Sequence, residues 1–248
     1  TVNANDSEQI KSSLMSRMTG ATGSFISSGI GAILSPNFDT VEVSTNLKEG
    51  DSSFDIGVLK AFGDNPNSFL FNQINLNRFD KRTTLNLGFG YRNLNADETW
   101  MTGVNAFYDH ELDYDHQRAS VGLEAISSVG SFRLNQYYGL SGWTTGLDNV
   151  QEKALNGQDI EVGAPLPYLP WTNFSYRSFQ WDGASGAADL KGDEISLEAK
   201  LPIGLNIEVG KRSNDGVTED NEFLKLTWTC CNKNQEEISI SDTAYNLT

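Results

Sequence analysis

The sequence lacks the features that define several common protein classes. Its 248 residues include only two cysteines, Cys230 and Cys231, which are adjacent and so cannot form the spaced framework of a disulfide-stabilised domain. Two cysteines and two histidines without ligand spacing also give no zinc motif. No run approaches the roughly 20 consecutive apolar residues that a transmembrane helix requires. These absences exclude a disulfide scaffold, a structural zinc domain and a helical membrane protein.

Positive charge is also scarce. The chain has 18 lysines and arginines against 33 aspartates and glutamates, which gives a formal net charge of -15. Phosphate backbones repel such an acidic chain, so nucleic acid is not an expected partner. The mean hydropathy of -0.40 taken alone suggests a water-soluble domain. However, a membrane β-barrel alternates polar and apolar residues and averages to a similarly polar value.

The sequence does contain a two-residue alternation of apolar and polar side chains. Leu85, Leu87, Phe89 and Tyr91 share one face of an extended strand, while small and polar residues occupy the other face. The same pattern, bounded by turn-forming residues, recurs at 53–58, 118–124, 194–201, 205–210 and 224–229. About twelve strands fit between residues 37 and 229, which suits an even-numbered closed barrel.

The two ends of the chain differ from this central region. In residues 1–36, Ile10, Leu14 and Met18 recur at four-residue spacing, which predicts a weakly helical periplasmic segment. Residues 37–229 are predicted to form the barrel, and residues 230–248 a polar tail or the start of a linker that enters the lumen. The predicted fold is therefore all-β: a transmembrane antiparallel barrel of about 12 strands with a short N-terminal helical segment.

The chemistry of the strand faces predicts which one lines the interior. The polar face is small and mixed, with charges of both signs, which suits a narrow and hydrated lumen. Asn86 and Gly88 are then expected to tolerate larger polar side chains. A soluble β-sandwich with an apolar core also alternates, so the pattern alone leaves that alternative open. The charged residues predicted to face the lumen, where most should pair and some should hold a returning segment, are Asp55, Arg92, Asp109, Arg118, Glu124, Arg133, Glu161, Arg177, Glu198, Glu208 and Lys225.

Connections between the predicted strands alternate in length. Longer ones at 110–117, 144–156, 182–189 and 213–221 alternate with tighter ones at 63–68, 94–98, 127–130 and 202–204. Long outer loops and short inner turns are typical of outer-membrane barrels, so the alternation predicts that location with a periplasmic N-terminus. Aromatic residues near strand ends are expected to anchor the barrel at the membrane interfaces. They are Trp100, Tyr108, Tyr138, Tyr168, Trp171, Tyr176 and Trp228.

Several segments, in their order and spacing, resemble a known family. They are SFLFNQ at 68–73, RTTLNLGFGYR at 82–92, WMTGVNAFYD at 100–109, LSGW at 140–143, NGQD at 156–159 and APLPYLP at 164–170. This set is similar to the β-domain of inverse autotransporters, the intimin and invasin adhesins, over nearly all of residues 10–229. The resemblance implies a twelve-stranded outer-membrane barrel and a linker that returns through the lumen. In that family the linker leads to an extracellular passenger, which the barrel helps to export and then anchors.

Two functions are consistent with this resemblance. The first is the translocator and anchor barrel of an inverse autotransporter adhesin, with four expected partners: outer-membrane lipid, the outer-membrane assembly machinery, a C-terminal passenger and a host or cell-surface receptor. The sequence departs from the family in that no passenger follows Cys230–Thr248, either because the chain is a truncated fragment or because this member has no passenger. The alternative is therefore a passenger-free outer-membrane channel or structural barrel.

Catalytic and metal-binding patterns are weak. Residues 110–116 (HELDYDH) hold two imidazoles and three carboxylates, a donor set for a divalent metal. No helical spacing presets their geometry, so a polar loop is the favoured interpretation. No G-x-S-x-G elbow presents a serine nucleophile, and Gly88 and Gly90 lie within a strand and not before a helix. We therefore expect no enzyme activity, no metal and no cofactor.

Overall fold

The computed structural model describes residues 34, 37–48, 51–79, 81–202, 204–215 and 220–230. The helix predicted in residues 1–36 lies outside the described residues, apart from Leu34. The tail predicted for residues 230–248 also lies outside them, apart from Cys230, which ends the last strand. In the described part of the chain, no helix has the length and apolar character needed to cross a membrane.

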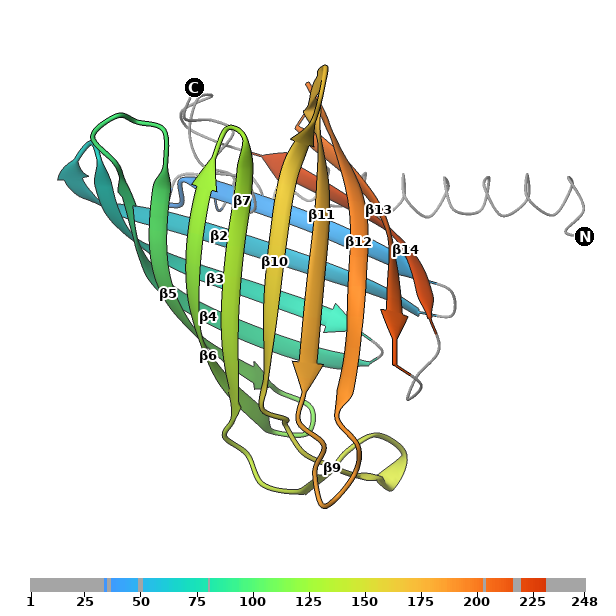
Figure 1. Ribbon diagram of the computed structural model, residues 1–248. Helices are drawn as coiled ribbons and strands as arrows, with labels where there is room; N and C mark the ends of the chain where they lie inside the picture. The colour runs from blue at the N-terminus through green and yellow to red at the C-terminus, as the bar shows by residue number, and fades with distance from the viewer. Residues whose placement is uncertain are drawn as a thin grey trace, which may run out of the picture.

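Twelve strands close into one antiparallel barrel in which neighbours in sequence are neighbours in space (Figure 1). Closure is made by β1, which pairs with β2 on one side and with β14 on the other. This confirms the predicted barrel. The strands are β1 (Thr40–Lys48), β2 (Asp51–Asn65), β3 (Ser68–Phe79), β4 (Arg82–Leu94), β5 (Met101–Glu111), β6 (His116–Ser127), β7 (Gly130–Gly139), β10 (Gly157–Leu166), β11 (Leu169–Trp181), β12 (Leu190–Leu201), β13 (Leu205–Asn214) and β14 (Asn221–Cys230).

The apolar face of the strands points outward. On β4 to β6, Phe89, Val104, Val121 and Leu123 are 50–53% exposed, although large apolar side chains normally avoid water. A β-sandwich would bury these side chains between its sheets, so the soluble alternative is wrong. Strands of 9 to 15 residues are long enough to cross a bilayer at a tilt.

The two ends of the barrel differ in their connections. At the end where β1 begins and β14 ends, here called the turn end, the connections are 66–67, 95–100, 128–129, 167–168 and 202–204. The opposite loop end, at the foot of Figure 1, carries the connections 112–115, 140–156, 182–189 and 215–220. It also carries the short connections 49–50 and 80–81, and 112–115 is shorter than 95–100 at the turn end, so the loop-end connections are the longer ones only after β6.

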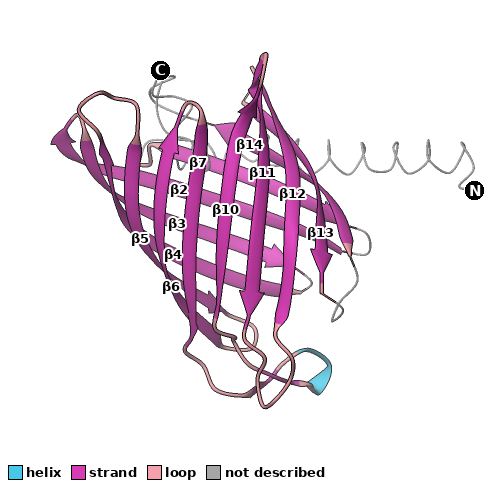
Figure 2. Ribbon diagram, in the orientation of Figure 1, coloured by secondary structure: helices cyan, strands magenta, loops and turns pink. Residues whose placement is uncertain are grey.

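The connection between β7 and β10 has secondary structure of its own. Within residues 140–156, β8 (Thr144–Thr145) pairs with β9 (Gln151–Glu152) around a short 3-10 helix, η1 (Leu147–Asn149), drawn in cyan in Figure 2. This small hairpin lies beyond the loop end of the barrel strands.

The β10–β11 hairpin extends past its neighbours at the turn end. Pairing of β10 with β7 ends at Gly163 and Ser131, and pairing of β11 with β12 ends at Thr172 and Ala199. The tip, residues 164–171, therefore overhangs the barrel wall and is the highest point of the strands in Figure 1. It contains three of the six prolines of the chain: Pro165, Pro167 and Pro170.

Candidate functional site: the barrel lumen

The inner faces of the strands surround a cavity of about 790 Å³. Among the described residues that line it, the only large apolar side chains are Phe79 and Phe223; the others are mainly amides, hydroxyls and charged groups. Polar groups of this kind can exchange hydrogen bonds with water, so the lining suits a hydrated cavity. The candidate functional site is therefore this polar-walled cavity inside the barrel.

A row of alternating charge crosses half of this wall. Strand register places six side chains next to one another in the order Glu124, Arg133, Glu161, Arg177, Glu194 and Arg212, from β6 to β13. We call this set the charge row. Arg133 Nη1 lies 2.7 Å from Glu161 Oε1, and Arg212 Nη2 lies 2.6 Å from Glu194 Oε2. Opposite charges on adjacent strands attract, so the row joins neighbouring strands and neutralises its own charge.

Arg92 continues the row across a glycine. The register runs from Arg92 on β4 through Gly103 on β5 to Glu124 on β6, and Arg92 Nε lies 2.6 Å from Glu124 Oε1. Both side chains are buried, with 6% and 5% exposure. The ion pair passes over Gly103, where a Cβ atom would collide with the carboxylate of Glu124. Glycine is thus required at this position by close approach of a side chain.

Asp159 is the most buried carboxylate of the lumen wall, with 2% exposure. It pairs with Arg177, accepts a hydrogen bond of 2.9 Å from the hydroxyl of Tyr137, and accepts one of 2.8 Å from Nδ2 of Asn135. Sequence reasoning missed Asp159, Glu42, Glu194 and Arg212 as lumen residues. The signal for three of them was an even spacing from predicted inward residues on the same strand: Asp159 is two residues from Glu161, and Glu194 and Arg212 are four residues from Glu198 and Glu208.

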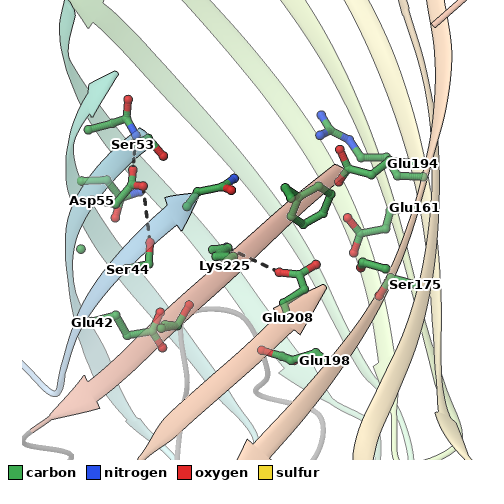
Figure 3. Close-up of a pocket in the computed structure, with 18 of the residues that line it drawn as sticks. Glu42, Ser44, Ser53, Asp55, Glu161, Ser175, Glu194, Glu198, Glu208 and Lys225 are labelled. Carbon is green, nitrogen blue, oxygen red and sulfur yellow. Dashed lines mark hydrogen bonds and ion pairs between the residues drawn. The ribbon is translucent and has the colours of Figure 1, made fainter. Parts of the chain in front are cut away.

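A second group of charges in the lumen is mainly negative. Glu42, Asp55, Glu198 and Glu208 come from β1, β2, β12 and β13, and the only cation that lies among them in the described wall is Lys225 of β14 (Figure 3). We call these five residues the acidic patch. Lys225 Nζ lies 4.0 Å from Glu208 Oε2, and Asp55 accepts hydrogen bonds from Ser44 (3.4 Å) and Asn77 (2.5 Å). Among these five residues, four carboxylates stand against one ammonium, so negative charge predominates in the acidic patch.

Nine of the eleven charged residues predicted from the sequence line the cavity: Asp55, Arg92, Glu124, Arg133, Glu161, Arg177, Glu198, Glu208 and Lys225. Asp109 and Arg118 do not line it, although their register places them on the same face. They pair with each other at 2.7 Å, and the Arg118 guanidinium lies 4.8 Å and 5.1 Å from the ring centres of Tyr137 and Trp181. Aromatic packing therefore separates this pair from the cavity.

The wall formed by β3 to β6 is packed in places, which corrects the expected tolerance of Gly88. A Cβ atom at Gly88 would collide with the ring of Phe107 on the neighbouring strand, and one at Gly90 would collide with the ring of Phe71. The ring of Phe71 also lies 4.6 Å from the Arg92 guanidinium. The hydrated-lumen expectation is wrong at Gly88, because the glycine makes room for an aromatic ring that faces the lumen.

The seven predicted interface aromatics fall into three groups. Tyr108 and Tyr138 lie near the loop end of β5 and β7. Tyr176 lies inside β11, where its hydroxyl donates a hydrogen bond of 2.6 Å to Asp193. The remaining four are at the turn end, where Tyr168 is fully exposed at the tip of the β10–β11 hairpin: Trp100, Tyr168, Trp171 and Trp228.

The two histidines of residues 110–116 have different partners. His110 Nε2 lies 2.7 Å from Asp115, whereas His116 Nε2 lies 3.3 Å from Glu152 in the β7–β10 connection. The two histidines, which are potential metal ligands, therefore do not share a partner. Across the described ranges, no cluster of three or more histidine, cysteine, aspartate or glutamate side chains is arranged to hold a metal ion.

Comparison with solved structures supports the architecture. The chain is similar to a structure reported under "Unveiling the Mechanism Behind the in-meso Crystallization of Membrane Proteins", with a TM-score of 0.71 and 21% identity over 84% of this chain and 88% of that one. It is also similar to the KdgM porin, with a TM-score of 0.53 and 9% identity over 76% of this chain and 98% of the porin. Identities this low show a shared fold and nothing about a shared activity.

Sequence relatives identify the family. The chain is 32% identical over 170 residues to Inverse autotransporter adhesin YeeJ of Escherichia coli (strain K12), covering 67% of this chain and 7% of that protein. It is 32% identical over 175 residues to Invasin of Yersinia enterocolitica, covering 68% and 19%. It spans about half the length of another relative from Escherichia coli (strain K12). The family is one of adhesin translocators and not of enzymes. The model of the "Inverse autotransporter, beta-domain" family matches residues 2–233, so this chain belongs to that family of outer-membrane barrels of intimin- and invasin-like adhesins.

Proposed function

We propose that this chain is a translocator and anchor, which exports a C-terminal passenger across the outer membrane and then holds it at the cell surface. The observation that carries the proposal is the polar cavity of about 790 Å³ inside a closed barrel of this family. A polypeptide in transit exposes amide and carbonyl groups, and a wall of amides, hydroxyls and paired charges can exchange hydrogen bonds with them and with water.

The lumen residues have distinct parts in this proposal. The charge row and the Arg92–Glu124 pair keep the wall rigid, because each arginine has a carboxylate partner. The acidic patch supplies the excess charge that a passing or resting segment meets (Figure 3). A segment with a cation facing this side would be held more strongly than an acidic one.

Orientation follows from the asymmetry of the two ends. Long connections gather at the loop end and most short ones at the turn end, which in outer-membrane barrels correspond to the cell exterior and the periplasm. The start of β1 is at the turn end, so the N-terminus is proposed to be periplasmic.

The test is to append a short epitope after Thr248 and to probe intact bacteria with an antibody and a protease. The proposal expects the epitope to be reached without permeabilising the outer membrane. An epitope placed before Thr1 is the matched control and should be reached only after permeabilisation. A C-terminal epitope that is also protected in intact cells, in a barrel that shows normal heat-modifiable migration, contradicts export.

Two partners are part of the same proposal. Membrane lipid would meet the aromatics at the turn end, with Trp100 and Trp228 at the periplasmic interface. Quenching of their fluorescence by lipids brominated near the headgroup tests this, and stronger quenching by lipids brominated at the chain end contradicts it. The assembly machinery would recognise the apolar and aromatic side chains Leu224 and Trp228 of the last strand. Loss of membrane insertion on Trp228→Ser would support that role, and normal insertion would contradict it.

The second candidate is a passenger-free channel or structural barrel, favoured by the cavity and by the net negative charge of the acidic patch. It predicts steady, cation-preferring currents from the intact chain in planar bilayers, because a negative wall concentrates cations. The intact mass of the protein from its native membrane discriminates the two candidates. A chain that continues well beyond Thr248 supports the translocator, and one that stops there supports the channel.

A further inference from the structure

The connection of residues 140–156 is held against the inner rim of the barrel at a specific point. Oε1 of Glu152, in β9, accepts a hydrogen bond of 2.7 Å from Nη2 of Arg82, and its Oε2 lies 3.3 Å from Nε2 of His116. We call Arg82, His116 and Glu152 the clasp. Arg82 begins β4 and His116 begins β6, so the clasp joins a connection that leaves β7 to its neighbour β6 and to β4, two strands further on.

Both rim residues of the clasp belong to the inner face. Arg82 pairs in register with Phe79, which lines the cavity. His116 ends a register row that starts with the cavity-lining residues Ser44, Asp55 and Asn77 and continues through Thr84 and Glu111. For Glu152 to reach these groups, the connection has to turn inward over the mouth of the lumen.

The surroundings of the clasp are polar and charged. Glu111 Oε2 lies 3.8 Å from Arg82 and 3.9 Å from His116, and it is buried without a hydrogen-bond partner. The Thr144 hydroxyl donates a hydrogen bond of 3.2 Å to the carbonyl of Tyr114 and lies 3.3 Å from Nδ1 of His116. The Tyr114 ring lies 5.2 Å from the Arg82 guanidinium. Two carboxylates, one guanidinium and one imidazole thus meet where the connection touches the rim.

Apolar packing contributes little to this attachment. The large apolar side chains Trp143 and Val150 of the connection are 50% and 57% exposed, so they are not buried against the rim. The side chains of the clasp are 11–26% exposed. The attachment therefore depends mainly on charge pairs and hydrogen bonds, which can be broken without exposing a core.

We propose that residues 140–156 form a strap over the β4–β6 side of the lumen mouth, and that the clasp keeps it closed. Release of Glu152 from Arg82 and His116 lets the strap swing away and widens the passage at the loop end. This goes beyond export and anchoring, because it concerns the width of the mouth and holds with or without a passenger.

The experiment measures access to a residue beneath the strap. Thr84→Cys lies on the inner face, two residues from Arg82 and in the register row that ends at His116. It is introduced in a Cys230→Ser, Cys231→Ser background of the full chain in lipid vesicles. A bulky maleimide is added from the loop side. Adding Glu152→Gln is expected to speed modification of the cysteine about tenfold, a shift of about 1.4 kcal/mol in the opening equilibrium. Asp148→Asn, which removes a charge from η1 of the same strap, should leave the rate unchanged.

Two further measurements make the outcome decisive. Asn221→Cys lines the cavity on β14, away from the clasp, and its modification should not respond to Glu152→Gln. Hydrogen exchange should speed in peptides from 140–156 and stay constant in β6. Equal rates at Thr84→Cys with and without Glu152→Gln overturn the strap. An equal acceleration at Asn221→Cys also overturns it, because the barrel as a whole would then have loosened.

Discussion

Two sides of the same lumen wall are built differently. On the packed side, around Phe71, Arg92, Phe107 and Glu124 of β3 to β6, rings lie against glycines of adjacent strands and an ion pair is buried. On the open side, the acidic patch faces a cavity, and its Lys225–Glu208 pair is 4.0 Å long and partly exposed. An inward-facing side chain is therefore not always exposed to the lumen. Side chains on the neighbouring strand can cover it.

The largest effect is expected from cutting the buried ion pair. Glu124→Ala leaves the Arg92 guanidinium buried without its partner, which should lower the free energy of unfolding by about 3–5 kcal/mol. Glu208→Ala on the open side should cost at most about 1 kcal/mol, because Lys225 is partly exposed and its partner is distant. Urea titrations in lipid vesicles, followed by tryptophan fluorescence, measure both. Equal losses would remove the distinction between the two sides.

The next largest effect is expected from placing a charge on the outer face of the barrel, compared with the same charge on the open side of the lumen. Ile195 faces outward in the middle of β12, and its neighbour Ser196 lines the cavity. Ile195→Arg should cost about 2–4 kcal/mol, because a charge at the bilayer midplane loses its hydration. Ser196→Arg should cost clearly less, since the guanidinium enters a cavity that contains carboxylates. The same titration measures both, and a larger loss for Ser196→Arg would contradict a hydrated lumen.

A smaller effect is expected at the glycine beneath Phe107. Gly88→Ser forces that ring to move and should cost about 1–3 kcal/mol, the range for overpacking a filled site. Ser175→Asn, which enlarges a cavity-lining side chain, should stay within about 0.5 kcal/mol. Combining Gly88→Ser with Phe107→Leu should recover part of the loss. Absence of any recovery would mean that the ring is not the cause.

The smallest effect is the response of residues 140–156, which lie at the lumen mouth above the packed side, to a fall in pH. The hydrogen bond and charge of Arg82, with a further contribution from His116, hold the pKa of Glu152 below its usual range. A carboxylate with a lowered folded-state pKa stabilises above its unfolded pKa of about 4.3 and loses that contribution only as the pH falls through the lower, folded value. Hydrogen exchange in 140–156, corrected for its intrinsic pH dependence, should therefore stay slow to about pH 4.3. Loosening that is already complete at about pH 6, well above the unfolded-state pKa of a glutamate, would contradict this role of Glu152.

Much of this architecture could be read from the sequence, because alternation has a direct physical cause. Successive strand residues point to opposite faces, so Leu87 and Gly88 could be assigned to opposite faces, and the strand number followed from the spacing of turns. The family resemblance indicated the same barrel, and the match over residues 2–233 agrees with it.

The contacts between neighbouring strands depend on strand register, which the alternation of residues within one strand does not specify. That Gly88 lies beside Phe107, or that Arg92 reaches across Gly103 to Glu124, follows from which residues stand opposite each other on neighbouring strands. The same is true of Arg118, which is inward but covered by Tyr137 and Trp181. The clasp is more distant still, because Arg82 and Glu152 are 70 residues apart in the chain.

The overhanging tip of the β10–β11 hairpin has a consequence for how barrels behave when they crowd together in a membrane. Two strand edges that project beyond their neighbours are a template on which a foreign strand can add, and so a source of aggregation. Proline has no amide hydrogen to donate, so Pro165, Pro167 and Pro170 interrupt the donors of those edges. Replacing all three with threonine should make the tip adhesive, and chemical cross-linking of densely reconstituted barrels should then trap dimers that the native protein does not form.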